Sequence, residues 1–204
     1  MLTRNFTVSA MTHTSETLQA AFGYLFVEEV QALKDLVRML PSQPEVLQIG
    51  AGAGTSSLAI LEARDDVHLT TIDIEAGDSP FGSLFAEKKV VTEAGHINRL
   101  TQVHGDSRYV DLERDALPFH MIFIDGDHSY EGCRADIIDW MAHLVHGGIM
   151  AIHDYNKADA YNNLTNDKAP HPKVWDGVDR AVNELLLGKF EKVLKVRSLI
   201  AFRI

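Results

Sequence analysis

The stretch "LQIGAGAGTSSLAIL", residues 47–61, decides the fold class of this chain of 204 residues. An apolar run leads into Gly50, Gly52 and Gly54, and these glycines lead into a segment typical of a helix. A glycine turn between a strand and a helix lets a ligand approach the backbone, although a tight turn without a ligand is the alternative. The third glycine comes one residue too early for the dinucleotide fingerprint G-x-G-x-x-G, which argues against a nicotinamide or flavin dinucleotide.

Short apolar runs alternate with amphipathic segments on both sides of this stretch. We expect strands over 45–50, 67–73, 99–105, 120–126 and 147–155, and helices over 55–64, 83–95, 130–145 and within 174–188. Such alternation predicts an α/β fold, with a parallel sheet covered by helices on both faces. The last stretch, 190–204, holds two short strands with no room for a crossover helix, so these strands must pair antiparallel.

Apolar spacing also predicts which helical residues are buried. A helix is expected from Ser15 until the prolines at 41 and 44, and its buried positions are Phe26, Val30, Leu33, Val37 and Leu40. In the helix over 130–145 the expected buried positions are Ile137, Ile138, Met141, Leu144 and Val145. Residues 1–14 read as a flexible arm, residues 156–172 as a long loop, and residues 15–204 as a single domain.

Composition limits the classes of partner. The net charge is -10, with 29 acidic and 19 basic Lys and Arg residues, so nucleic acid is not expected as a partner. No apolar stretch is long enough to span a bilayer, and the first residues contain no apolar segment of a secretory signal. The single cysteine, Cys133, cannot form an internal disulfide, which fits a cytoplasmic location.

Acidic residues follow the next two predicted strands. Asp73 ends the strand in "TTIDIE", where a carboxylate can accept hydrogen bonds from both hydroxyls of a ribose. Asp106 in "VHGDSRY" could accept from an adenine amino group, with Ser107 as a second polar contact. The competing interpretations are a cap or a solvated strand end for Asp73, and an N-cap of a following helix for Asp106.

Together these motifs resemble the class I S-adenosylmethionine-dependent methyltransferases. "VLQIGAGAGTSSLAIL" looks like the first motif of that family, "TTIDIE" looks like its ribose-binding motif, and the closing hairpin matches its seven-stranded, Rossmann-like sheet. The segments "IFIDGDHSYEGCRADIIDW", "GGIMAIHDY" and "WDGVDRAVNELL" resemble a bacterial subgroup near the catechol-type and macrocin-type O-methyltransferases and the cephalosporin-hydroxylase-like proteins. The resemblance implies that Gly50, Gly52, Gly54, Asp73, Asp106, Ser107 and Asp125 bind S-adenosylmethionine.

A second group of residues lies where two strands end. Asp125, Asp127 and His128 follow one strand, and His153, Asp154 and Asn156 follow another, so both groups should face one pocket. The similar O-methyltransferases bind a divalent cation with an Asp after the fourth strand and an Asp-Asp or Asp-Asn pair after the fifth. This implies Asp125, His153 and Asp154 as metal ligands.

The identity of the metal and of the base stays open from sequence. His153 stands where the family has an acid, and imidazole suits a transition metal better than Mg²⁺, with Mn²⁺ between them. The alternative chemistry uses His128 or His153 as a general base, with Asp125 among the candidate catalytic residues. Helix capping competes for this segment too, with Ser129 or Asp127 as the N-cap.

The predicted function is O-methylation of a hydroxylated small molecule, with or without a divalent cation. One alternative is a cephalosporin-hydroxylase-like oxygenase on the same fold, and another is a protein that binds the cofactor without turnover. A small-molecule acceptor is the expected partner. Because dimers are common among the similar enzymes, a homodimer is also to be considered.

Overall fold

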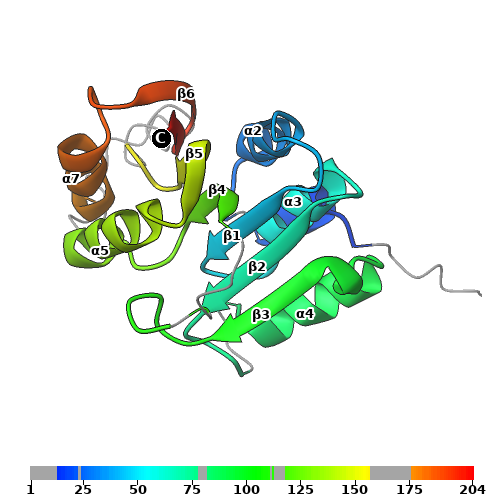
Figure 1. Cartoon of the computed structure of the whole chain (residues 1–204). Helices are drawn as coiled ribbons and strands as arrows, with labels where there is room; N and C mark the ends of the chain where they lie inside the picture. Colours follow the sequence, from blue (N-terminus) through cyan, green and yellow to red (C-terminus); the bar gives the residue numbers. More distant parts are fainter. Residues whose placement is uncertain (1–12, 23, 78–81, 111, 113–117, 157–175) are drawn as a thin grey trace, which may run out of the picture.

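A computed structural model of the protein describes residues 13–22, 24–77, 82–110, 112, 118–156 and 176–204. It contains a seven-stranded sheet with the strand order β3-β2-β1-β4-β5-β7-β6 (Figure 1). The strands are β1 (Glu45–Ile49), β2 (His68–Asp73), β3 (Leu100–His104), β4 (Phe119–Ile124), β5 (Leu144–Ile152), β6 (Glu191–Val196) and β7 (Leu199–Arg203).

The sheet is parallel through β5 and antiparallel at its end. β1 pairs in parallel with both β2 and β4, and β7 pairs antiparallel with β5 and with β6. The predicted fold class and the C-terminal hairpin are therefore confirmed. The chain runs outward from β1 to β3 and then returns to β4 on the other side of β1. This reversal is a topological switch point, where ligands bind in open α/β sheets.

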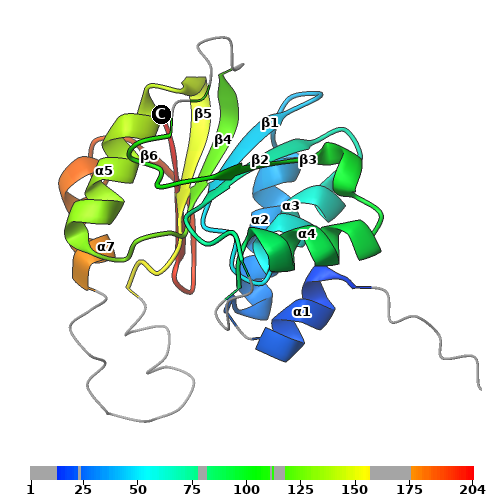
Figure 2. The ribbon, with the colours of Figure 1, turned by 90° about the horizontal axis from the view of Figure 1, so that it is seen from below.

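Helices cover both faces of the sheet (Figure 2). One face carries α1 (Ser15–Phe22), α2 (Val27–Arg38), α3 (Thr55–Ala63) and α4 (Leu84–Glu93), and the other carries α5 (Tyr130–Met141) and α7 (Asp176–Leu185). A short 3-10 turn, η1 (Ile97–Arg99), leads into β3. Because both faces are covered, the central strands are almost continuously apolar: in β4, five of the six residues in "FHMIFI" are buried.

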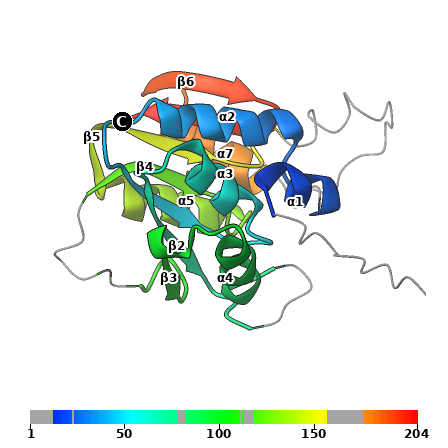
Figure 3. The same cartoon turned by 90° about the vertical axis from the view of Figure 1, so that its right-hand side faces the viewer.

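The N-terminal helix differs from the prediction. The expected single helix is interrupted after Phe22, and a second helix begins after Phe26, which is its N-cap residue. The carboxylate of Glu29 accepts a hydrogen bond from the Phe26 backbone N–H at 2.8 Å, and this contact caps the start of α2. The resulting α2 lies beside β6 (Figure 3).

The second difference concerns the end of α5. This helix ends at Met141, and Leu144 and Val145 belong to β5 rather than to the buried face of the helix. Ile138, also predicted as buried, is 43% exposed. Short apolar runs suit strands as well as helices, so the pattern alone could not place this boundary.

Two predicted segments fall largely outside the described residues. They are the arm over 1–14, of which only His13 and Thr14 are described, and the loop over 156–172, of which only Asn156 is described. Among the described residues, no helix is long and apolar enough to cross a membrane.

Candidate functional site

The glycine loop follows β1 at the switch point and is folded tightly against the end of β4. Gly50 has φ +96°, and a Cβ atom at this position would lie 2.2 Å from the carbonyl oxygen of Asp125. Only glycine fits such an approach. Gly54, with φ +87°, is the N-cap residue of α3, and Gly52 has φ +50°. The three predicted glycines thus form the bare turn that the sequence indicated.

Asp73 ties the end of β2 to this loop. Its Oδ2 accepts a hydrogen bond from the Ala51 N–H at 2.6 Å, and its Oδ1 accepts from the Glu75 N–H at 2.7 Å. Each carboxylate oxygen can accept a further hydrogen bond. Asp73 therefore both shapes the loop and presents acceptor capacity to the pocket beside it.

Two pockets adjoin at the glycine loop. The first, here called the Asp73 pocket, has a volume of about 400 Å³ and is lined by Asp73, Asp106, Ser107, Asp127 and Asp136 among others. The second, called the His128 pocket, has a volume of about 320 Å³ and is lined by Tyr24, Leu25, Thr55, His128 and Asp154 among others. Gly50, Gly52 and Asp125 line both.

The residues after β3 form a turn in which Asp106 pairs with Arg108. Both oxygens of Asp106 accept hydrogen bonds from the Arg108 guanidinium, at 2.9 and 2.6 Å, and Oδ1 also accepts from the Arg108 backbone N–H. These hydrogen bonds hold the pKa of Asp106 below its usual value. Asp106 therefore caps a turn and pairs with Arg108, and its role toward an adenine amino group stays a prediction.

Ser107 also lines the Asp73 pocket, and its hydroxyl forms a hydrogen bond to a residue of α5. Its hydroxyl donates a hydrogen bond to Oδ1 of Asp136 at 2.5 Å. Asp136 is a buried residue of α5 that sequence reasoning did not single out. Burial, together with the negative charges of Asp106 and Asp127, raises the pKa of Asp136 to about 6, although the hydrogen bond from Ser107 opposes the increase.

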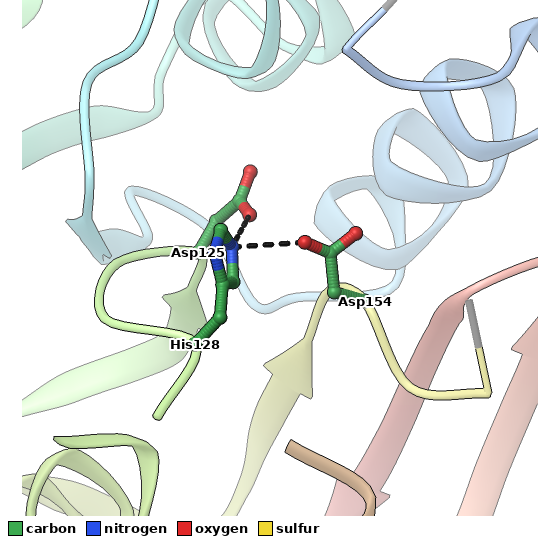
Figure 4. A group of neighbouring side chains, drawn as sticks. All are labelled: Asp125, His128 and Asp154. Carbon is green, nitrogen blue, oxygen red and sulfur yellow. Dashed lines mark ion pairs between the residues drawn. The ribbon is translucent and has the colours of Figure 1, made fainter. Parts of the chain in front are cut away.

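The His128 pocket contains a compact group of side chains at the ends of β4 and β5, and Figure 4 shows three of them, Asp125, His128 and Asp154. Nε2 of His128 lies 2.8 Å from Oδ2 of Asp154 and 3.7 Å from Oδ1 of Asp125. Asp154 is buried and has φ +66°, a backbone conformation that is costly for a residue other than glycine and is often found at functional sites.

His128 is strongly biased toward its charged form in this setting. Burial on its own lowers the pKa of an imidazole, but the hydrogen bonds and charges of Asp125 and Asp154 outweigh it and raise the pKa of His128 to about 9. Conversely, burial on its own raises the pKa of Asp125, but the charges and hydrogen bonds of His153 and His128 hold it below the usual range.

His153 is almost fully buried, although it also lines the His128 pocket. Its Nδ1 lies 3.0 Å from Oδ1 of Asp125 and 3.2 Å from Oδ1 of Asp154, and its Nε2 lies 3.1 Å from Oε2 of Glu29. Burial opposes a charged imidazole, yet the facing carboxylates raise the pKa of His153 well above its usual value. Both ring nitrogens thus face carboxylates, which favours a positioning role over a base or a metal ligand.

Glu29 is a residue of this site that the sequence analysis did not predict. Its side chain is fully buried and also accepts hydrogen bonds from the N–H and the hydroxyl of Ser198, at 2.7 and 2.6 Å. It comes from α2, 124 residues before His153. No local spacing joins two residues so far apart. The only local signal is that Glu29 stands three residues after Phe26, at the N3 position from which a glutamate can cap the start of a helix.

The candidate metal ligands differ by one residue from the predicted set. Among the described residues, Asp125, His128 and Asp154 offer ligand atoms that lie within 4.8 Å of one another, and His153 is not in this group. Two carboxylates and one imidazole suit a transition-metal ion such as Mn²⁺ or Zn²⁺ better than Mg²⁺, which prefers oxygen ligands. Metal binding, and the choice between His128 and His153 as ligand, stays a prediction.

The helix entry after β4 has a simple explanation. Oγ of Ser129 accepts the Gly132 N–H at 3.0 Å, which makes Ser129 the N-cap of α5, while Asp127 accepts the N–H of Ser129 at 2.8 Å. The capping interpretation therefore holds for Ser129. It leaves His128 directed toward Asp125 and Asp154.

Fold and site together define a Rossmann-like α/β protein with a candidate ligand site at its switch point, formed by a glycine loop, an acid after β2 and acids after β4 and β5. Residues 47–155, more than half of the chain, match the model of a methyltransferase-domain family. The chain belongs to this methyltransferase family.

A relative found by sequence comparison agrees with this membership. A protein of Mycobacterium ulcerans named "Putative O-methyltransferase" is 29% identical over 163 residues, which cover 76% of this chain and 63% of that protein. The chain thus spans less than two thirds of that relative's length.

Two solved structures share the fold. One, from Staphylococcus aureus and described as a "putative caffeoyl-CoA O-methyltransferase", has a TM-score of 0.72 at 18% identity, covering 94% of this chain and 92% of that one. The other is the O-methyltransferase TomG of Streptomyces achromogenes in complex with S-adenosylmethionine, with a TM-score of 0.67 at 18% identity, covering 93% and 87%.

Proposed function

We propose that the protein transfers the methyl group of S-adenosylmethionine to a hydroxyl group of a small molecule. The observation that carries this proposal is the pair of adjoining pockets that share Gly50, Gly52 and Asp125. One pocket offers acidic acceptors suited to a nucleoside, and the other holds a cluster of ionisable side chains suited to proton transfer. A ligand lying across the loop would bring its two halves into the two pockets.

The residues present fit this cofactor. Asp73 retains acceptor capacity toward ribose hydroxyls, and the loop of Gly50 and Gly52 leaves space for the chain that carries the sulfonium. The hydroxyl of Thr55 is buried in the wall of the His128 pocket and has no hydrogen-bond partner among the described residues. A buried hydroxyl without a partner is costly, so a polar ligand group is expected to contact it.

The main requirement of methyl transfer is that the protein positions the acceptor oxygen in line with the methyl group of the donor. The bond from sulfur to the methyl carbon breaks as the bond from the acceptor oxygen to that carbon forms, and the hydroxyl must give up its proton. His128 is the candidate acceptor of this proton, since it faces the His128 pocket beside Asp154. A sulfonium cation bound nearby disfavours a second positive charge on His128 and so lowers its pKa, which increases the share of neutral imidazole that can accept a proton.

A divalent ion is the second route for the same step. Asp125, His128 and Asp154 would hold it, as their donor set allows. When bound, such an ion would supply a Lewis acid that holds the acceptor's hydroxyl and lowers its pKa. In that case His128 would be a neutral ligand of the ion and would not be the acceptor of the proton.

The first experiment measures cofactor binding directly. Calorimetric titration of the wild-type protein with S-adenosylmethionine and S-adenosylhomocysteine should show one site per chain. Asp73→Ala should weaken both affinities by at least about 100-fold, since it removes two acceptors for the ribose and loosens the loop. Glu75→Gln, next to the same loop, is the control and should bind as the wild type does. Unchanged affinity in Asp73→Ala would remove the ribose assignment.

The second experiment measures turnover. Methyl transfer from radiolabelled S-adenosylmethionine to a panel of phenols, catechols and sugars is compared with and without EDTA, in the wild type and in His128→Gln. Loss of activity in EDTA with recovery on adding Mn²⁺ supports the metal route, whereas full activity in EDTA and loss in His128→Gln supports the base. Tight cofactor binding without transfer to any acceptor would favour a binding protein without turnover.

A further inference from the structure

The buried carboxylate of Asp136 is a group that the proposed chemistry does not use. It lies in the middle of α5, is only 2% exposed, and lines the Asp73 pocket. Most buried carboxylates are paired with a cation or with several donors. Among the described residues, however, the one donor to Asp136 is the hydroxyl of Ser107.

That hydrogen bond fixes the direction of the Ser107 hydroxyl. A serine hydroxyl has a single proton, and at 2.5 Å this proton lies on the line from Oγ to Oδ1 of Asp136. The lone pairs of Oγ are then directed away from Asp136. Because Ser107 also lines the pocket, its hydroxyl oxygen is presented there as an acceptor and not as a donor.

The neighbouring carboxylate has the same character as the Ser107 oxygen. Asp127 lines the same pocket as Asp136, and Nε and Nη2 of Arg108, which also lines the pocket, donate hydrogen bonds to Asp106. A base bound against Ser107 and Asp136 therefore meets hydrogen-bond acceptors. Adenine offers an exocyclic amino group, which is a donor. Hypoxanthine offers a carbonyl oxygen at the same position, and this acceptor would face the acceptor oxygens of Ser107 and Asp136.

We propose that Asp136 is a specificity-determining residue that acts through Ser107, holding its hydroxyl as an acceptor so that the pocket selects a 6-amino purine over a 6-oxo purine. The inference rests on the proposed function, because it assumes that the nucleoside half of the cofactor occupies the Asp73 pocket. The inference assigns the choice between 6-amino and 6-oxo purines to Asp136 and Ser107. Asp106 instead accepts hydrogen bonds from Arg108.

The test compares two ligands that differ only in this group. S-adenosylhomocysteine and its deaminated analogue S-inosylhomocysteine are titrated calorimetrically into the wild type, Asp136→Asn, Ser107→Ala and Asp139→Asn. Asp139 lies on the exposed face of the same helix, so Asp139→Asn is a matched control for the substitution in α5. The measured quantity is the ratio of the two dissociation constants, which a loss of packing alone would not change.

The wild type and Asp139→Asn should bind the adenosyl ligand about 10-fold to 100-fold more tightly, as expected when a buried donor–acceptor match is replaced by a mismatch. In Asp136→Asn the amide can donate to Oγ of Ser107 and free its proton for the pocket, so the ratio should fall to about 3 or less. Ser107→Ala should lower the ratio as well, and it decides the matter if Asp136→Asn does not fold.

Three results would overturn the inference in different ways. A wild-type ratio near 1 shows that the pocket does not distinguish a 6-amino from a 6-oxo purine. An undiminished ratio in Asp136→Asn or in Ser107→Ala shows that other residues make this distinction. In both cases binding of S-adenosylhomocysteine leaves the proposed function standing. If the wild type binds neither ligand, the proposed function itself fails, and this inference fails with it.

Discussion

Replacing Glu29 tests the buried part of the site in isolation from any ligand. Its carboxylate accepts four hydrogen bonds, from the N–H of Phe26, the N–H and hydroxyl of Ser198, and Nε2 of His153. These donors come from the start of α2, the turn between β6 and β7, and the end of β5. In Glu29→Gln the shape is kept, but one acceptor oxygen becomes an amide that faces donors, and the charge opposite His153 is lost.

The expected cost follows from what remains unpaired. Removing one partner of a buried ion pair costs about 3–5 kcal/mol, because the other charge stays buried without compensation. Gln retains one acceptor oxygen, so we expect Glu29→Gln to lower the free energy of unfolding by about 2–4 kcal/mol and Glu29→Ala by about 3–5 kcal/mol. The measurement is urea-induced unfolding followed by circular dichroism.

Glu28→Gln is the matched control, since the neighbouring Glu28 side chain is 52% exposed and forms a surface ion pair with Arg197. Such pairs contribute about 0–1 kcal/mol. If Glu29→Gln destabilised the protein no more than Glu28→Gln does, the carboxylate would not be supporting His153, and the description of His153 as a buried imidazolium would be refuted.

Three further expectations concern His128, Cys133 and metal binding. The pKa of His128 is raised from 6.5 to about 9, so its contribution to stability is fully present below pH 6.5 and is lost as the pH rises through 9. The free energy of unfolding should therefore fall between pH 6.5 and 9 by about 1–2 kcal/mol more in the wild type than in His128→Gln, after allowance for solvent screening at this partly exposed side chain; equal slopes would contradict the pairing. Burial, with the charges of Asp136 and Asp127, raises the pKa of the Cys133 thiol to about 12, so maleimide should label it only after denaturation, and rapid labelling of the native protein would show an accessible thiol. Mn²⁺ titration followed by electron paramagnetic resonance should show a site that Asp154→Asn weakens by at least about 10-fold, and Asp139→Asn, as the control, should leave the Mn²⁺ affinity unchanged; equal affinity in Asp154→Asn would place the ion elsewhere.

The strands and the loop could be predicted because their determinants are local. Buried parallel strands appear as apolar runs, and the glycines at 50, 52 and 54 mark the turn that follows β1. Boundaries were less secure where one pattern serves two structures. Leu144 and Val145 are apolar and follow a helix, so they were assigned to that helix, yet they pair in β5. The break before α2 cannot be predicted from apolar spacing, because Phe26 fits a helical face as well as an N-cap position.

The deeper contacts of the site could not be predicted from spacing. The pairing of Glu29 with His153 joins residues far apart in the chain, and it depends on how α2 lies beside β6. Asp136 appears in the sequence as one polar residue of an amphipathic helix, with nothing to distinguish it from Asp139, although one is buried in the pocket wall and the other is exposed. Only tertiary packing separates the two.

The charge of the buried cluster links its stability to its proposed ligand. Three carboxylates, those of Glu29, Asp125 and Asp154, face two imidazoles, those of His128 and His153. With both imidazoles protonated, three negative charges and two positive charges leave one net negative charge beside the His128 pocket. Burying an unbalanced charge is costly, and a cation bound in the pocket would balance it. On the proposed function the methyl donor is such a cation, and its product has lost the cationic centre. The cluster therefore favours the donor over the product, which is the order of affinities that lets an enzyme release its product and bind its donor again.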